Sequence, residues 1–99
     1  MDIADWRQKI DEIDERLTKL LCERSRCVIE IGKIKRQRHL PIYDPEREKD
    51  IISRITRHNQ GPLRNDALIR LFERILDESR RVERLMAGEH QPDKGANPL

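Results

Sequence analysis

Apolar residues recur in alternating steps of three and four along the first third of the chain, the pattern of a helix with one apolar side. No proline interrupts it before Pro41, so we expect one long helix over residues 4–38. Such a helix is roughly 50 Å long, more than the width of a compact domain of this size. Part of it must therefore pack outside its own fold. The apolar positions are Ile3, Trp6, Ile10, Ile13, Leu17, Leu20, Cys27, Ile31 and Ile34.

Two shorter helices are predicted in the rest of the chain. The second begins at Asp44, which can cap free amides, and Pro45 suits its first turn. It ends near the breaker cluster at residues 59–62. The third begins near Asn65 and runs to about Ala87, with apolar residues at helical spacing. The predicted fold is therefore all-α, with three helices per chain.

These helices form one expected domain over residues 1–87. Residues 88–99 are polar, contain glycine and proline, and lack periodicity, so we expect a disordered tail. The 99 residues are 40% charged, 35% hydrophobic and only 3% aromatic, too few large side chains for a generous core within one chain. We therefore expect the chain to self-associate.

The charge balance and the start of the chain exclude some classes of partner. The net charge of +2 comes from 21 basic and 19 acidic residues that are closely interspersed, so neither nucleic acid nor a membrane surface is an expected partner. Residues 1–6 are acidic and no long apolar run follows, which argues against a signal peptide or membrane anchor. We expect a cytoplasmic protein that binds anions only locally.

Two cations interrupt the apolar side of the first helix. Arg24 lies between Leu20 and Cys27, where an unpaired cation would be costly to bury unless an anion meets it. Lys35 follows about three turns later on nearly the same side, roughly 16 Å away, so the two could bracket a small dianion. In the alternative, Arg24 pairs with a glutamate of another helix and Lys35 reaches water.

Arg7 lies on the same helix, roughly 25 Å from Arg24. This distance is too long for both residues to hold one small ligand within a single chain. Arg7 could join such a site only from a second copy of the chain.

Polar residues also fall on the inner faces of the other two helices. Glu48 lies on the apolar face of the second helix, whereas capping explains Asp44 and exposed ion pairs could explain Arg47. On the third helix, a buried Ser79 could bond a carbonyl one turn back. A buried Glu83 has no such partner, so it must pair with a cation or be protonated.

The sequence offers no metal or cofactor motif. His39, His58 and His90 are scattered without metal-ligand spacing, and no glycine-rich phosphate loop or nucleophile with an adjacent base stands out. We expect neither a metal nor a cofactor. Any chemistry would have to be electrostatic.

These residues together give the chain a family likeness: residues 4–87 resemble the all-helical chorismate mutases. The matching motifs contain Arg7 in Trp-Arg-Gln-Lys-Ile-Asp-Glu-Ile-Asp, Arg24 in Leu-Leu-Cys-Glu-Arg, Lys35 in Ile-Gly-Lys-Ile-Lys, the run Asp44-Pro45-Glu46-Arg47-Glu48, and Ser79 in Asp-Glu-Ser-Arg-Arg. Each motif is weak alone, but five in order make a strong signal. The resemblance implies an intertwined homodimeric helical bundle with two sites, each receiving Arg7 from the partner chain.

The resemblance also implies the reaction, the rearrangement of chorismate to prephenate on the route to phenylalanine and tyrosine, with no cofactor. Orientation and preorganised electrostatics suffice for such a reaction. Lys35, Glu83 and Arg24 are the expected catalytic residues, with Lys35 donating to the ether oxygen. The expected substrate-binding residues are Arg7 and Arg24 on the carboxylates, supported by Ser79 and Arg47, and Asp44 and Glu48 near the ring hydroxyl.

Glu83 departs from the commonest bacterial pattern, in which glutamine donates a second hydrogen bond to the ether oxygen. A carboxylate there would repel the charge that develops on this oxygen. We therefore hypothesise that Glu83 works in its protonated form.

Three alternatives remain open on the sequence. Isochorismate pyruvate lyases share this fold and much of the same constellation, and a fold does not determine the reaction. The basic segment 33–38 could bind nucleic acid on a helical dimer, although the near-balanced charge counts against it. The chain could also dock onto another shikimate-pathway enzyme.

Overall fold

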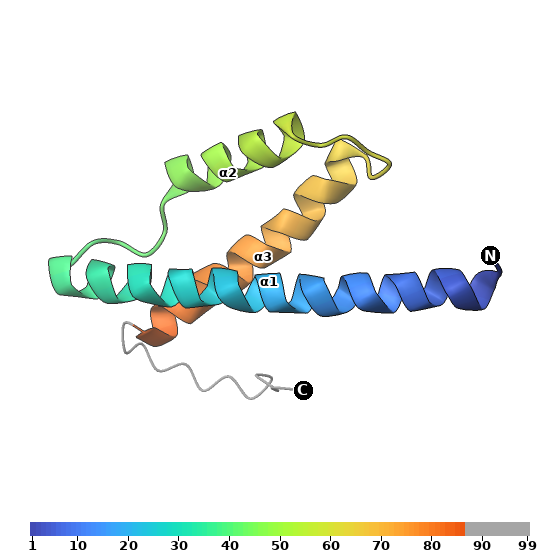
Figure 1. Ribbon diagram of the computed structural model, residues 1–99. Coiled ribbons are helices and arrows are strands. Elements are labelled where there is room, and N and C mark those ends of the chain that lie inside the picture. The colour runs from blue at the N-terminus through green and yellow to red at the C-terminus, as the bar shows by residue number, and fades with distance from the viewer. Residues whose placement is uncertain (87–99) are drawn as a thin grey trace.

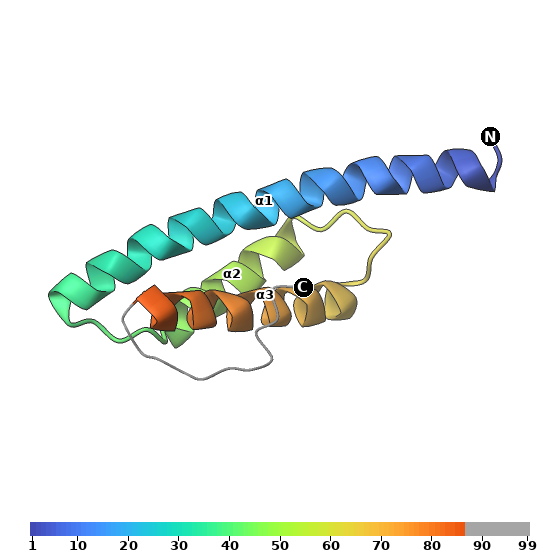
Figure 2. The same ribbon diagram turned by 90° about the horizontal axis from the view of Figure 1, so that it is seen from below.

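The computed structural model describes residues 1–86, which form three helices: α1 (Ile3–Arg38), α2 (Pro45–Arg57) and α3 (Asn65–Met86). This confirms the all-α class and the long first helix. α3 packs against both α1 and α2, and within the described residues those two do not pack directly on each other. Figures 1 and 2 show α1 crossing the layer formed by α2 and α3. The expected tail at residues 88–99 lies outside the described residues.

Local chemistry explains where the first two helices begin. The Asp2 carboxylate accepts a hydrogen bond from the Asp5 backbone N–H at 3.1 Å, and the Asp5 carboxylate accepts one from the Asp2 backbone N–H at 2.9 Å. The two bonds form a capping box at the start of α1. Asp44 Oδ1 accepts from the Arg47 backbone N–H at 3.1 Å, and Pro45 opens α2 as predicted. α1 ends where His39 adopts a left-handed conformation with φ of 55°.

The close approach of α1 and α3 depends on Gly32. A Cβ at this position would lie 3.3 Å from Cβ of Met86 and 3.4 Å from Cα of Glu83, so the glycine lets the two backbones meet. Among residues 1–86, only Gly32, Leu76 and Glu83 are buried, and Gly32 and Glu83 meet at this contact. A single chain therefore has almost no private core, in line with its composition.

The N-terminal half of α1 projects beyond α2 and α3 (Figures 1 and 2). Its apolar side chains are open to solvent, with Trp6 at 55%, Ile10 at 54% and Ile13 at 50% exposure. A continuous apolar stripe of this kind on a helix is typical of a surface that packs against a partner.

None of the three helices in the described part combines the length and apolarity needed to cross a membrane.

Candidate functional site

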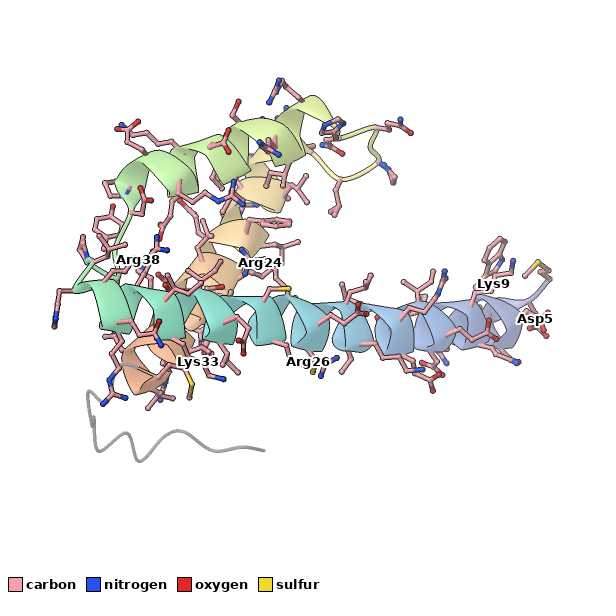
Figure 3. All side chains as sticks on the ribbon, turned by 60° about the vertical axis from the view of Figure 1, so that its left-hand side comes forward. Asp5, Lys9, Arg24, Arg26, Lys33 and Arg38 are labelled. Carbon is pink, nitrogen blue, oxygen red and sulfur yellow. The ribbon has the colours of Figure 1, made fainter. Side chains whose placement is uncertain are left out.

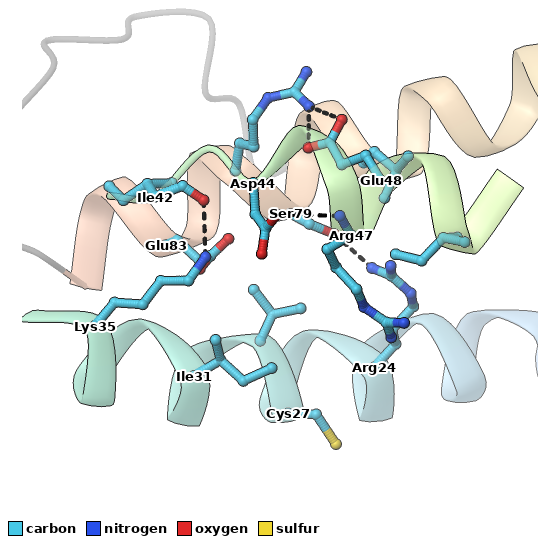
Figure 4. Close-up of a pocket in the computed structure, with 14 residues that line it drawn as sticks. Arg24, Cys27, Ile31, Lys35, Ile42, Asp44, Arg47, Glu48, Ser79 and Glu83 are labelled. Carbon is cyan, nitrogen blue, oxygen red and sulfur yellow. Dashed lines mark hydrogen bonds and ion pairs between the residues drawn. The ribbon is translucent and has the colours of Figure 1, made fainter. Parts of the chain in front are cut away.

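The three helices enclose a cavity of about 260 Å³ beside the C-terminal half of α1. Polar groups converge on its wall from all three helices (Figure 4). The polar residues that line it are Arg24 and Lys35 from α1, Asp44 at the cap of α2, Arg47 and Glu48 from α2, and Ser79, Arg80 and Glu83 from α3. Every site residue predicted from the sequence except Arg7 therefore lines one cavity.

Lys35 is held on two sides in this cavity. Its ammonium donates to the carbonyl oxygen of Ile42 at 2.8 Å and lies 2.7 Å from Oε1 of Glu83, with only 18% of its side chain exposed. The alternative in which Lys35 reaches water is therefore wrong. An ammonium has three N–H donors, and among residues 1–86 only the Ile42 carbonyl accepts a hydrogen bond from it, so donors remain for a ligand.

Glu83 is the buried acid that the sequence pattern indicated, with 7% of the residue exposed. Its Oε1 forms the ion pair with Lys35, but within residues 1–86 this oxygen accepts no hydrogen bond. Buried carboxylate oxygens normally have such a partner. Of the two alternatives for a buried Glu83, a cation partner or a proton, the structure shows the cation partner, and Oε1 can still accept a hydrogen bond.

Arg24 lines the cavity without a counter-ion among residues 1–86. It donates to the hydroxyl of Ser79, which in turn donates to the Ile75 carbonyl at 2.9 Å, one turn back as predicted. Burial, and secondarily the positive charge of Arg47, lowers the pKa of Arg24. Within residues 1–86 no carboxylate pairs with it, so the alternative of a glutamate partner is wrong. This cation needs an anion that the described chain does not supply.

The α2 residues differ in how firmly they are held. Asp44 caps the helix and also lines the cavity, while Arg47 pairs with Asp50 at 2.9 Å on the exposed side. Glu48 is bound by Arg80, with 2.6 Å and 2.5 Å from one guanidinium nitrogen to its two oxygens. Arg47 thus has an exposed partner that a ligand could replace, whereas Glu48 is fixed.

Arg7 does not reach the cavity of its own chain. It lies in the exposed N-terminal half of α1, it does not line the cavity, and no acid of residues 1–86 pairs with it. The separation predicted from helix geometry is therefore present in the structure. If Arg7 acts at a site, that site belongs to another copy.

Three features of the site were not predicted from the sequence. The Ile42 carbonyl is a backbone group of a loop, which no side-chain pattern indicates. Arg80 and Gly32 could have been found, because Arg80 lies on the α3 face between Leu76 and Glu83, and a glycine inside a long helix often marks a close approach.

The site therefore has a general character: a helical cavity that contains an ordered ammonium and a guanidinium without a carboxylate partner among residues 1–86, an arrangement suited to an anion. Among residues 1–86 there is no group of three histidine, cysteine or acidic side chains that could hold a metal ion. The donors suit carboxylates and a developing negative charge on oxygen.

Comparison with known proteins identifies the family. The family profile described as "Chorismate mutase type II" matches residues 6–84. The chain belongs to this family. The resemblance noted from the sequence motifs is thus confirmed.

Individual relatives agree. A chorismate mutase of Methanocaldococcus jannaschii is 34% identical over 93 residues, covering 90% of this chain and 91% of that protein. A bifunctional chorismate mutase/prephenate dehydratase of Aquifex aeolicus is 34% identical over 87 residues, or 84% of this chain. The chain spans only 24% of the length of that bifunctional relative.

Solved structures show the same fold. Form II of the chorismate mutase from Thermus thermophilus matches with a TM-score of 0.81 and 34% identity, covering 82% of this chain and 92% of that one. The chorismate mutase of Helicobacter pylori in complex with prephenate matches with a TM-score of 0.80 and 27% identity, covering 90% of this chain and 97% of that one.

Proposed function

We propose that this protein converts chorismate to prephenate by an intramolecular rearrangement, in a site that two copies of the chain share. The observation that carries the proposal is Arg24, a part-buried cation that faces the cavity without a carboxylate partner among residues 1–86. Chorismate carries two carboxylates, so it can supply the missing charge. Membership of the chorismate mutase type II family supports the same reaction.

Catalysis would rest on positioning and on fixed charges. The substrate must fold so that its two reacting carbons meet while the carbon–oxygen bond of the ether breaks. Arg24, supported by Ser79 and Arg47, would hold a carboxylate of the folded substrate, and Asp44 and Glu48 would face the ring hydroxyl. Holding a reactive conformer in this way removes much of the entropic part of the barrier.

Lys35 would stabilise the negative charge that builds on the ether oxygen. The hydrogen bond to Ile42 and the ion pair with Glu83 hold the ammonium in place before the substrate arrives, and N–H donors remain for the ether oxygen. A donor that is fixed in advance does not have to reorganise in the transition state, which is where such donors are most effective.

Glu83 would be the second donor to the ether oxygen, and it can donate only when it is protonated. Its Oε1 lies 2.7 Å from the Lys35 ammonium. A carboxylate beside the ether oxygen would repel the negative charge that develops there, so the role of donor requires the protonated form. Activity should therefore fall as pH rises.

A second copy would complete the site. The exposed apolar stripe of α1, including Trp6, Ile10 and Ile13, would be buried against the partner, as a chain with so small a core requires. The same association would carry Arg7 to the partner's cavity. Symmetric pairs of this kind are the commonest oligomers.

The test follows loss of chorismate absorbance with purified protein from about pH 4 to about pH 9, for wild type and Glu83→Gln in parallel. We expect wild type to form prephenate and to lose activity at high pH, and Glu83→Gln to be active with a flatter profile. An identical profile in the two proteins would contradict the protonated role of Glu83.

A parallel assay for pyruvate release from isochorismate separates the two enzyme reactions. If neither chorismate nor isochorismate is converted at any pH, the proposed function is wrong. Sedimentation of the same samples gives the oligomeric state, and a monomer that is fully active would contradict the shared site. The expected lack of nucleic-acid binding stays a prediction, and docking to another enzyme stays an alternative.

A further inference from the structure

Arg80 connects α3 to α2 through a carboxylate of the site. One of its guanidinium nitrogens lies 2.6 Å and 2.5 Å from the two oxygens of Glu48, and both side chains are only 22% exposed. Both residues line the cavity that contains Arg24 and Lys35, and both also line a second, more open cavity, called here the outer cavity. The pair thus lies between the candidate site and the outer cavity.

Arg80 is itself held in place by other groups. Its second terminal nitrogen pairs with Asp77 one turn back on α3, and its guanidinium lies 5.5 Å from the centre of the Tyr43 ring. The hydrogen bond to Glu48, opposed by burial, raises the pKa of Arg80. The guanidinium therefore remains a cation throughout the pH range of an assay.

This arrangement constrains the position of Glu48. One guanidinium nitrogen of Arg80 contacts both carboxylate oxygens, and Arg80 is itself tied to Asp77, so the carboxylate is held at a defined place on the cavity wall. Its oxygens keep lone pairs for another donor. A hydroxyl in the cavity would therefore meet an acceptor in a fixed place.

We propose that Arg80 is a positioning residue, which holds the Glu48 carboxylate in place to accept a hydrogen bond from the hydroxyl-bearing side of the substrate. The proposal rests on the proposed function, since it assigns Glu48 a bound substrate. The rival explanation is that Arg80 is only a structural clasp between α2 and α3. The two differ in whether the effect of Arg80 depends on Glu48.

A double-mutant cycle distinguishes them, with kcat and KM for chorismate measured for wild type, Arg80→Met, Glu48→Gln and the double variant. Loss of a residue that orients a ligand group typically costs about 10- to 100-fold, so we expect Arg80→Met to lower kcat/KM about tenfold. In the Glu48→Gln background the same change should cost less than about twofold, because coupled residues are not additive.

The matched control is Arg84→Met, which removes a cation one turn further along α3 that lines the outer cavity and not the candidate site. It should leave kcat/KM within about twofold of wild type. Arg80→Lys keeps the charge without the planar fork and should recover part of the loss. It also provides a second variant should Arg80→Met fold poorly, which thermal melting followed by circular dichroism would show.

Equal losses from Arg80→Met with and without the Glu48 carboxylate would overturn the proposal and leave a structural clasp. The same conclusion follows if activity simply tracks the melting temperature across the four proteins. Absence of chorismate conversion by wild type would instead refute the proposed function, and with it the role given to Glu48. The wild-type rate and the cycle therefore separate the two failures.

Discussion

In the C-terminal half of α1, Gly32 meets α3 at backbone distance, and Arg24 and Lys35 face a cavity. In the N-terminal half, Trp6 and Ile10 continue the same apolar spacing, yet each is more than half exposed. The two halves have one pattern and two different environments. An apolar side of a helix indicates that it needs a partner, and the partner can come from the same chain or from another copy.

The largest expected effect is in the half that packs within the chain. Lys35→Ala should lower kcat about a hundred- to a thousandfold, because it removes a preorganised donor to developing charge. Lys33→Ala is the control, since Lys33 pairs with the exposed Glu30 and points away from the site (Figure 3). Steady-state assays at saturating chorismate measure both, and comparable losses would contradict the role of Lys35.

Arg24→Met should separate activity from stability in the same half. We expect kcat/KM to fall about a hundredfold, because truncating one partner of a buried charge pair costs several kcal/mol of binding. The free energy of unfolding should stay within about 1 kcal/mol of wild type, since one hydrogen bond to Ser79 is lost while an unpaired cation is no longer buried.

The small expected change in the free energy of unfolding follows from the sign of the pKa change at Arg24. Burial lowers this pKa, so the folded chain binds the proton less tightly than the unfolded chain does. The protonated side chain therefore costs stability at every pH below the lowered pKa, and the cost is constant across the assay range. Urea unfolding of wild type and Arg24→Met at two pH values measures the difference in the free energy of unfolding. A large loss of stability in Arg24→Met would show that the residue has a structural partner.

Mixing two inactive variants tests the exposed half. Arg7→Ala and Lys35→Ala should each be impaired alone, but in a random mixture half of the dimers pair one of each. One of the two sites in such a dimer has both residues intact, so about a quarter of wild-type activity should return. If Arg7 serves its own chain, mixing restores nothing. The measurement is the chorismate assay after unfolding and refolding the variants together.

The smallest effect concerns the contact that distinguishes the two halves. Gly32→Ala places a methyl group 3.3 Å from Cβ of Met86, so α3 must shift by a few tenths of an ångström. Overpacking costs about 1–3 kcal/mol, and the better helix propensity of alanine returns about 1 kcal/mol. We expect a net loss of at most about 2 kcal/mol, measured by urea unfolding.

The same substitution should lower kcat several-fold, because Gly32 sets the separation of Lys35 and Glu83. If Gly32→Ala were as active as wild type, the Lys35–Glu83 contact would not depend on the close approach. The control is Gln8→Ala, at an exposed position of the N-terminal half on the side away from the apolar stripe. It should change neither stability nor rate by much.

Much of the fold follows from the amino-acid sequence alone. Helical periodicity, the Asp44 cap and the break at residues 59–62 depend on neighbours within a few residues, and they predicted all three helices of the described chain. Periodicity also identified Arg24, Lys35 and Glu83 as polar residues on inner faces, and the resemblance to the family implied that they share a site.

Only the tertiary structure decided which residues of different helices and loops contact one another. That Lys35 meets the Ile42 carbonyl, that Arg24 meets Ser79 rather than a glutamate, and that Arg80 takes both oxygens of Glu48 depend on crossing angles and loop paths. Helical spacing determines the direction of each side chain on its own helix and carries no information on the distance between helices. That distance is set by contacts such as Gly32 against α3, where the absence of a side chain lets two backbones approach.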